Sequence, residues 1–165
     1  MIPWKTRPAE EKTLLSPSFC SVLLWQAAGG YSSIANTRLP FDLAFLVLPI
    51  VLHRNTRTSL PKAVTTSLAV WLDDNPLMRA RIADRARTLV PFTKEALLFG
   101  GLHGLLDLAN ASVGEAPDWK KRIGAEIKAS SDEVQECASR AYFLGRWLAK
   151  GGSPSTVMAT LGVRP

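Results

Sequence analysis

The sequence has few of the groups from which catalytic and metal sites are usually built. It contains only two histidines, His53 and His103, and two cysteines, Cys20 and Cys137. Their spacing does not match a metal site, and the chain lacks a nucleotide-binding P-loop and a serine nucleophile elbow. An enzyme would therefore need one of the histidines to meet a distant carboxylate. We expect no catalytic residue, no cofactor and no bound metal, and we predict that the chain is not an enzyme.

The sequence also lacks an apolar run of membrane-spanning length. The longest, residues 43–52 (LAFLVLPIVL), is about half of the roughly 20 residues that a spanning helix needs, and Pro49 interrupts it. Residues 1–12 are polar and charged, unlike a secretory leader. Both cysteines lie among apolar neighbours, as buried thiols do. We therefore expect a protein of the reducing cytoplasm that makes no contact with a membrane.

Acidic residues are outnumbered by basic ones, which gives the chain a net charge of +6. Such a charge favours nucleic acid or an acidic protein as a partner, without giving specificity. A length of 165 residues with 47% hydrophobic residues predicts one domain with a real core. We assign residues 1–15, with mixed charges and prolines, to a flexible N-terminal arm. Trp4 is the one residue there that could anchor the arm to another surface. Residues 16–165 form the single helical domain.

The apolar run at residues 43–52 is the strongest structural signal in the chain. A segment that is apolar on every side must be buried in protein. Periodicity cannot separate helix from strand here, but the leucine and alanine content favours a helix that is kinked or ended near Pro49. A buried strand is the alternative. We predict that residues 55–62 form a loop, so that residues 53–57 (HRNTR) lie at the surface.

Capping residues and apolar spacing predict helices through most of the remaining chain. A Ser-Pro start at residues 16–17 opens one helix, which Gly29 and Gly30 are expected to stop or bend. Amphipathic spacing continues over residues 63–73 and again after Pro76. We expect Pro91 to end that second helix, so that Thr93 caps a new one reaching about residue 102.

A small hairpin is expected after that helix. Residues 105–109 resemble a short strand, residues 110–117 are rich in turn formers, and residues 119–122 could return as the second strand. Ser130 with Glu133 forms a capping box that opens the next helix. The predicted fold class is mainly α, a single compact helical domain that can include a small β-hairpin and is winged-helix-like in its element order.

Two basic groups are candidates for binding a partner. His53 and Arg54 lie in the polar segment after the apolar run, together with Arg57, which could equally be an ion-pair partner inside the fold. Arg81 and Arg85 share one helix face, where they could contact phosphates or an acidic protein. The alternative for this pair is a solvated helix surface.

Four stretches of the chain carry a resemblance to a known family: residues 39–61, 93–100, 144–147 and 161–165. Together they resemble the small middle component of bacterial three-component ABC systems, the group that includes Lamassu-type anti-phage defence. The resemblance covers about residues 17–165. It implies a non-catalytic adaptor that links an SMC-like ABC ATPase to an effector, often a nuclease. ATP hydrolysis and DNA cutting would belong to those partners.

We select seven residues as candidates for contacting the ATPase or the effector. They are His53, Arg54, Arg57, Arg81, Arg85, Arg146 and Arg164. DNA contact within the complex stays open at this point. The alternative function is a winged-helix-like DNA-binding regulator, which would place the arginine helix on the phosphates and bind duplex DNA in a salt-dependent way.

Overall fold

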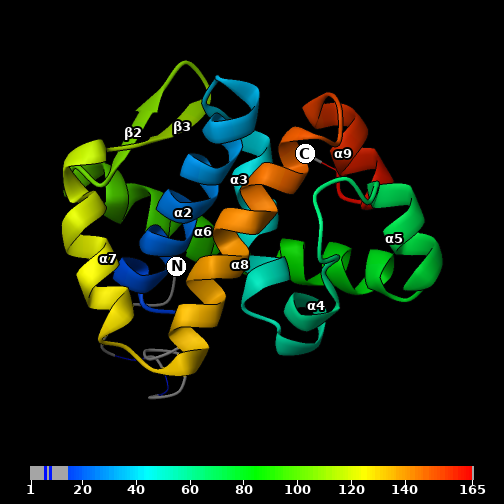
Figure 1. Ribbon diagram of the computed structural model, residues 1–165, viewed down its shortest axis with the longest axis horizontal. Coiled ribbons are helices and arrows are strands. Elements are labelled where there is room, and N and C mark those ends of the chain that lie inside the picture. Colours follow the sequence, from blue (N-terminus) through cyan, green and yellow to red (C-terminus); the bar gives the residue numbers. More distant parts are fainter. Residues whose placement is uncertain (1–5, 7, 9–14, 165) are drawn as a thin grey trace.

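The computed structural model describes Thr6, Pro8 and residues 15–164, and this part of the chain is mainly helical, as predicted. It contains eight α-helices, one short 3-10 helix and a three-stranded antiparallel sheet (Figure 1). Most of the predicted N-terminal arm, including Trp4, lies outside the described residues. Among the helices described, none combines the length and the apolar character that a membrane crossing requires.

Helices α2 (Pro17–Ala35) and α8 (Asp132–Ala149) form the central pair of the domain (Figure 1). Pro17 takes the first helical position of α2, as predicted. The expected stop at Gly29 and Gly30 is wrong, because α2 continues to Ala35 and ends at Asn36 in the left-handed conformation. The backbone of Tyr142 in α8 fills the space that a Cβ on Gly30 would need. That glycine therefore serves helix packing rather than helix termination.

The cap of α8 lies one residue later than predicted. The hydroxyl of Ser131 accepts the backbone N–H of Val134, so Ser131 is the N-cap residue. Ser130 instead donates its hydroxyl to the carbonyl oxygen of Glu126 in the preceding helix. The predicted capping box with Glu133 is therefore wrong, although the helix itself is confirmed.

The apolar run forms α3 (Phe41–Val51), so the helical option is confirmed. Every residue from Leu46 to Val51 is buried, among neighbours from α2, α6 and α8. Pro49 lies in the last turn, where the helix is about to end and the lost hydrogen bond disturbs little that follows. This all-round burial is what an all-round apolar helix requires.

The predicted loop over residues 55–62 is wrong in its first half, which forms α4 (Arg54–Ser59). His53 caps this helix, because its ring nitrogen Nδ1 accepts the backbone N–H of Thr56 at 3.2 Å. The next helix, α5 (Leu68–Asp74), starts later than the predicted residue 63, at the point where Ser67 supplies the cap. In both cases a side-chain cap fixes the first residue of the helix.

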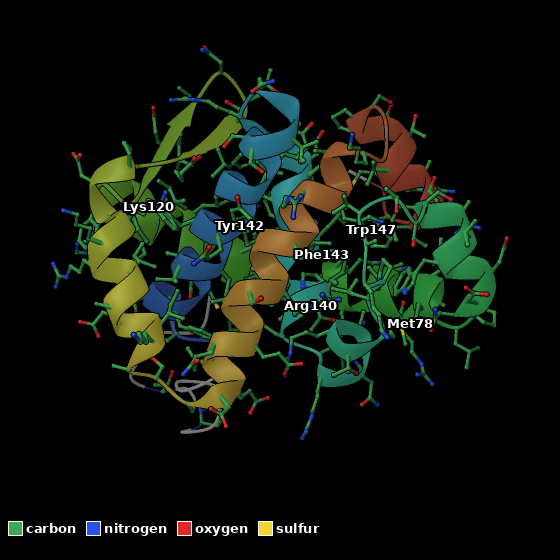
Figure 2. The ribbon with its side chains drawn as sticks, in the orientation of Figure 1. Met78, Lys120, Arg140, Tyr142, Phe143 and Trp147 are labelled. Atoms are coloured by element: carbon green, nitrogen blue, oxygen red, sulfur yellow. The ribbon has the colours of Figure 1, made fainter. Side chains whose placement is uncertain are left out.

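Two tryptophans hold the connection between α4 and α5. The indole N–H of Trp71 donates to the carbonyl of Ser59 at 2.7 Å, and that of Trp147 donates to the carbonyl of Thr66 at 2.6 Å. The two rings meet edge to face with centroids 5.3 Å apart. Arg140 of α8 donates to carbonyls of the same connection, and Figure 2 shows it on the same helix as Trp147.

Helix α6 (Met78–Leu102) is continuous, so the predicted break at Pro91 is wrong. Pro91 lies on the exposed side of the helix, and buried positions occur both before it, at Ile82, and after it, at Ala96. The hydroxyl of Ser21 in α2 donates to the carbonyl of Ala96 at 2.5 Å. Packing of both halves against α2 and α3 offsets the hydrogen bond that the proline removes.

The sheet consists of β1 (Leu39–Pro40), β2 (Leu106–Ala109) and β3 (Ser112–Glu115), in the order β1-β3-β2. The first predicted hairpin strand is confirmed. The second is wrong, because the chain turns already at residues 110 and 111, both of which have a φ of 52°.

Helices replace the predicted return strand. Residues 119–122 fall instead in the short 3-10 helix η2 (Pro117–Trp119) and in α7 (Lys120–Lys128). Helix α9 (Pro154–Thr160) is the last element of the chain.

Candidate partner interface

Three of the seven predicted residues, His53, Arg81 and Arg85, come together where α4 meets the first half of α6, and Arg54 follows His53 as the first residue of α4. We call His53, Arg54, Arg81 and Arg85 the basic cluster. The guanidinium of Arg85 holds the two elements together: its Nη2 donates to the hydroxyl of Thr56 at 2.7 Å. Its Nε donates to the carbonyl of Pro49 at 2.9 Å, which fixes α6 against the end of α3 as well. Arg85 is therefore a positioning residue, and the exposed cations beside it rest on a rigid support.

Positive charge is concentrated at the basic cluster. Burial, followed by the charges of Arg85, Arg81 and Arg57, lowers the pKa of the His53 imidazole below its usual 6.5. Burial and the charge of Arg81 also lower the pKa of the Arg85 guanidinium. Both shifts mean that an additional positive charge is disfavoured at this place, and that a negative charge brought to it would be stabilised.

Arg54 and Arg81 are the members of the cluster that face solvent. Within the described part of the chain, neither guanidinium takes part in an ion pair or a hydrogen bond. Arg87, on the same helix as Arg81, is paired with Asp84 at 3.3 Å and so differs from both. Two exposed guanidinium groups without a carboxylate are suited to bidentate contact with carboxylates or phosphates of a partner.

Arg57 has a different role from its neighbours in sequence. Its side chain is only 1% exposed, and its Nη2 lies 3.0 Å from Glu136 and 3.3 Å from Glu133, both on α8. Its Nη1 donates to the carbonyl of Val51 at 2.9 Å. The structure thus shows Arg57 as the internal ion-pair partner, which was the alternative that the sequence left open. It anchors α4 on α8 and presents no surface to a partner.

The two remaining candidates lie apart from the basic cluster. Arg164 lines a hollow of about 400 Å³ beside α9, together with Arg79 from the start of α6. Arg146 is half-buried on α8. No contact described for either residue joins it to His53, Arg54 or Arg81. The seven predicted residues are therefore not one site.

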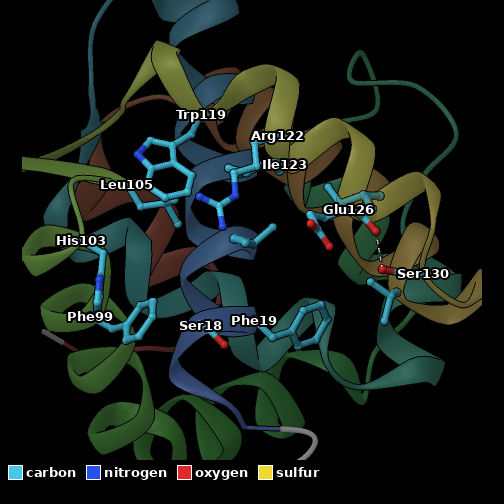
Figure 3. Close-up of a pocket in the computed structure, with 13 residues that line it drawn as sticks. Ser18, Phe19, Phe99, His103, Leu105, Trp119, Arg122, Ile123, Glu126 and Ser130 are labelled. Atoms are coloured by element: carbon cyan, nitrogen blue, oxygen red, sulfur yellow. Dashed lines mark hydrogen bonds between the residues drawn. The ribbon is translucent and has the colours of Figure 1, made fainter.

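Sequence reasoning missed a groove of about 660 Å³ that we call the α7 groove (Figure 3). Its walls come from the start of α2, the end of α6, α7 and the start of α8. Trp119, Ile123 and Ile127 line it from the α7 side, spaced four residues apart. This four-residue spacing is helical and could have revealed the apolar wall from the sequence. The prediction of a strand at residues 119–122 is the reason that it was missed.

The cysteine and histidine side chains are the described groups most often used in catalysis or metal binding. No group of three metal-ligating side chains was found among them. Burial, helped by the charge of Glu95, raises the pKa of the Cys20 thiol to about 12, so this sulfur is not a ready nucleophile. His103 lies against the ring of Phe99 with centroids 4.2 Å apart. Neither histidine is hydrogen-bonded to a carboxylate within the part of the chain that the structure covers.

Comparison with known families gives one match. The family model described as "ABC-three component (ABC-3C) system Middle Component 3" matches residues 4–165. The chain belongs to this family. No curated protein and no solved structure matches this Middle Component 3 chain. The resemblance seen in the sequence is thus confirmed at the level of a three-component ABC system.

Membership in the Middle Component 3 family implies partners within the same multi-component ABC system. A subunit of such a system needs surfaces at which those partners bind. In this middle component, the basic cluster offers an exposed charged surface, and the α7 groove offers a mainly apolar one.

Proposed function

We propose that this chain is the non-catalytic adaptor of its three-component system, acting in the cytoplasm. In this role it links an SMC-like ABC ATPase to an effector, often a nuclease, in anti-phage defence of the Lamassu type. The family match supports a place in a three-component ABC system, and the exposed basic cluster and the α7 groove are surfaces suited to binding partners. Hydrolysis of ATP and cutting of DNA are assigned to the partners.

We assign the contact with a partner to the basic cluster, which docks on an acidic surface of the ATPase or the effector. One observation carries the assignment: Arg54 and Arg81 belong to two helices joined by the hydrogen bond from Arg85 to Thr56, and both face solvent without an ion pair among the described residues. Arg85 joins α6 to α4 by one hydrogen bond and to the end of α3 by another, so its support is ordered before a partner binds. An acidic partner would supply the missing charge.

Co-purification tests the docking surface. The ATPase and the effector of the same system are expressed with the wild-type chain or with the double variant Arg54→Glu and Arg81→Glu. We expect the double variant to lose at least one partner while its circular dichroism and melting temperature stay unchanged, because both side chains are exposed. The matched control, Lys121→Glu and Lys128→Glu on α7, has the same change in charge and should retain both partners.

Two results would contradict this assignment. Complete recovery of both partners by the Arg54→Glu, Arg81→Glu variant removes the basic cluster from the interface. Equal loss with the α7 control shows that overall charge, rather than this surface, governs assembly. The adaptor role itself has a separate test: without this chain, the ATPase and the effector should fail to co-purify, and the chain alone should hydrolyse no ATP.

DNA binding is the second candidate function, and the same exposed guanidinium groups favour it. The isolated chain would then bind duplex DNA with an affinity that falls steeply as salt rises, since each neutralised phosphate releases counterions. Removing Arg54 and Arg81 should reduce the slope of log affinity against log salt by about 2, one for each lost phosphate contact. Absence of binding at low salt would leave the acidic protein as the partner.

A further inference from the structure

The α7 groove is a space between helices that the packing of the domain leaves unfilled. Helix α7 packs mainly against α8 and η2, and the groove lies between its apolar side and the walls formed by α2 and α6. Ile123 is the one buried residue of α7, whereas Trp119 and Ile127 on the same wall are half-buried. The volume of about 660 Å³ is within the range of binding pockets.

The opposite wall of the groove is also apolar. It includes Phe19 and Val22 from α2 and Phe99 from α6, all of them half-buried. Figure 3 shows Phe19 and Phe99 on one side of the groove and Trp119 with Arg122 on the other. In the free subunit both walls therefore keep apolar surface in contact with water. Covering that surface with an apolar partner is favourable.

The spacing of the wall residues matches the period of a helix. Trp119, Ile123 and Ile127 follow one another at four-residue steps, each of which is about 6 Å along a helix. Phe19 and Val22 on the facing wall are three residues apart. Side chains of a third helix, repeating at the same period, fit between rows of this kind. The groove therefore suits an amphipathic helix with apolar anchors one turn apart.

Arg122 adds a charge requirement to this apolar surface. Its guanidinium lies over the ring of Trp119, with Cζ 5.0 Å from the ring centroid. Glu126 borders the groove one turn further along α7, but no ion pair joins the two, and Arg122 has no other ion pair in the described part of the chain. An exposed guanidinium placed on an aromatic ring beside an apolar groove is complemented by a carboxylate of the occupant.

We propose that the α7 groove binds an amphipathic helix of the ATPase or the effector, whichever of the two does not dock on the basic cluster. This helix presents apolar anchors one turn apart to the two walls and an acidic side chain to Arg122. The inference rests on the proposed adaptor function, because a chain that links two partners needs a separate surface for each of them.

Binding of the purified ATPase and of the purified effector to the full chain tests the proposal. We expect Arg122→Glu to weaken the binding of one partner by about tenfold or more and to leave the other unchanged. The matched control is Lys121→Glu, an equal change of charge at an exposed neighbour that does not line the groove. It should bind both partners like the wild type. The double variant Arg54→Glu and Arg81→Glu should weaken the binding of the other partner.

A fluorescent label reports occupation of the groove directly. An environment-sensitive dye is attached at Ile127→Cys, or at Lys128→Cys as the control on the neighbouring exposed position. The native thiols are buried and do not compete for the dye. Addition of the partner that Arg122→Glu weakens should shift the emission at position 127 to the blue, because the dye leaves water. The emission at position 128 should stay in place.

Crosslinking identifies the occupant. With p-benzoylphenylalanine in place of Phe19, light should join the chain to a helical segment of that partner. The segment should carry apolar residues one turn apart and an aspartate or glutamate within a turn of them. A crosslink to a second copy of the chain, or to a segment without an acidic residue, overturns the proposal.

The outcomes separate this inference from the adaptor function. Unchanged binding of both partners by Arg122→Glu overturns the groove as an interface, while the adaptor function stands as long as the chain still links the two partners. Loss of the same partner in Arg122→Glu and in the basic-cluster variant also overturns it, because a single interface then covers both surfaces. If the wild-type chain binds neither partner, the adaptor function fails, and this inference fails with it.

Discussion

Gly145 of α8 lies against the backbone of Ala27 in α2, so that a Cβ at Gly145 would come within 2.0 Å of the Ala27 carbonyl oxygen. Gly30 stands in the same relation to the carbonyl of Tyr142, in the opposite direction across the interface. The central helix pair is therefore packed backbone to backbone at two points. Neither contact can be relieved by rotating a side chain.

Substituting Gly145→Ala should destabilise the protein by at least about 2 kcal/mol, because the added methyl group forces two buried helices apart. Urea unfolding followed by circular dichroism measures the change. The matched control is Gly124→Ala on α7, where a Cβ meets nothing within 4 Å. That variant should gain about 0.5–1 kcal/mol, as alanine does in place of glycine in a helix. Equal stability of the two variants would show that the contact is not tight.

Arg57 and Arg54 occupy the same short helix, but the same substitution should destabilise the protein strongly at Arg57 and hardly at all at Arg54. Arg57→Met should lower the free energy of unfolding by about 2–4 kcal/mol, because it removes the ion pairs to Glu133 and Glu136 and leaves the carbonyl of Val51 with only the weak thiol donor of Cys137. Both carboxylates are partly exposed and regain water, which limits the loss. Arg54→Met should change stability by less than about 0.5 kcal/mol. If both variants unfold at the same urea concentration, the internal role of Arg57 is wrong.

The His53 cap predicts a loss of stability towards acid pH. The folded-state pKa of His53 lies below 6.5, so the native state binds the proton less readily than the unfolded chain. The stabilisation is therefore complete above pH 6.5 and is lost as pH falls through the folded-state value. The neutral ring also accepts the N–H of Thr56, and the imidazolium cannot do so.

Comparison with His53→Asn isolates this contribution, since asparagine is a good N-cap that does not titrate. The free energy of unfolding, measured at pH 7.5 and 5.0, should fall more in the wild type than in the variant. An NMR titration of the imidazole should give a midpoint below 6.5. Identical pH dependence of the two proteins would show that the cap does not sense protonation.

If an acidic partner docks on the basic cluster, its binding should be coupled to the same proton. The negative charges of the partner would offset those of Arg81 and Arg85, which now help to lower the pKa of His53. The pKa would rise on binding, so the complex should take up a proton and tighten as pH falls from 7.5 to 6. Calorimetry in two buffers of different ionisation enthalpy measures the uptake, and His53→Asn should abolish it.

The sequence predicted features set by local chemistry and missed those set by distant contacts. A run that is apolar on all sides must be buried, and α3 is. The helix break at Pro91 did not occur, because packing partners on α2 and α3 continue past the proline. Likewise, the stop predicted at Gly30 of α2 is wrong because the contact of this glycine, Tyr142 in α8, lies more than 100 residues further along the chain.

The candidate interface was likewise predictable only where local spacing determines it. Arg81 and Arg85 share a face by their spacing, and His53 and Arg54 follow the buried run directly. That the two pairs meet depends on how α6 crosses α3, which no local pattern encodes. The burial of Arg57 depends on Glu136, 79 residues further along.

Helix α6 connects the two surfaces described above. Arg81 lies in its first turns and Phe99, at the α7 groove, near its end. At 1.5 Å per residue, the 18 steps between them amount to about 27 Å. A partner bound at Arg81 is thus kept at one distance from the α7 groove by a single helix packed along both halves. In an assembly, the subunit would then set a fixed distance between the partner at the basic cluster and the α7 groove.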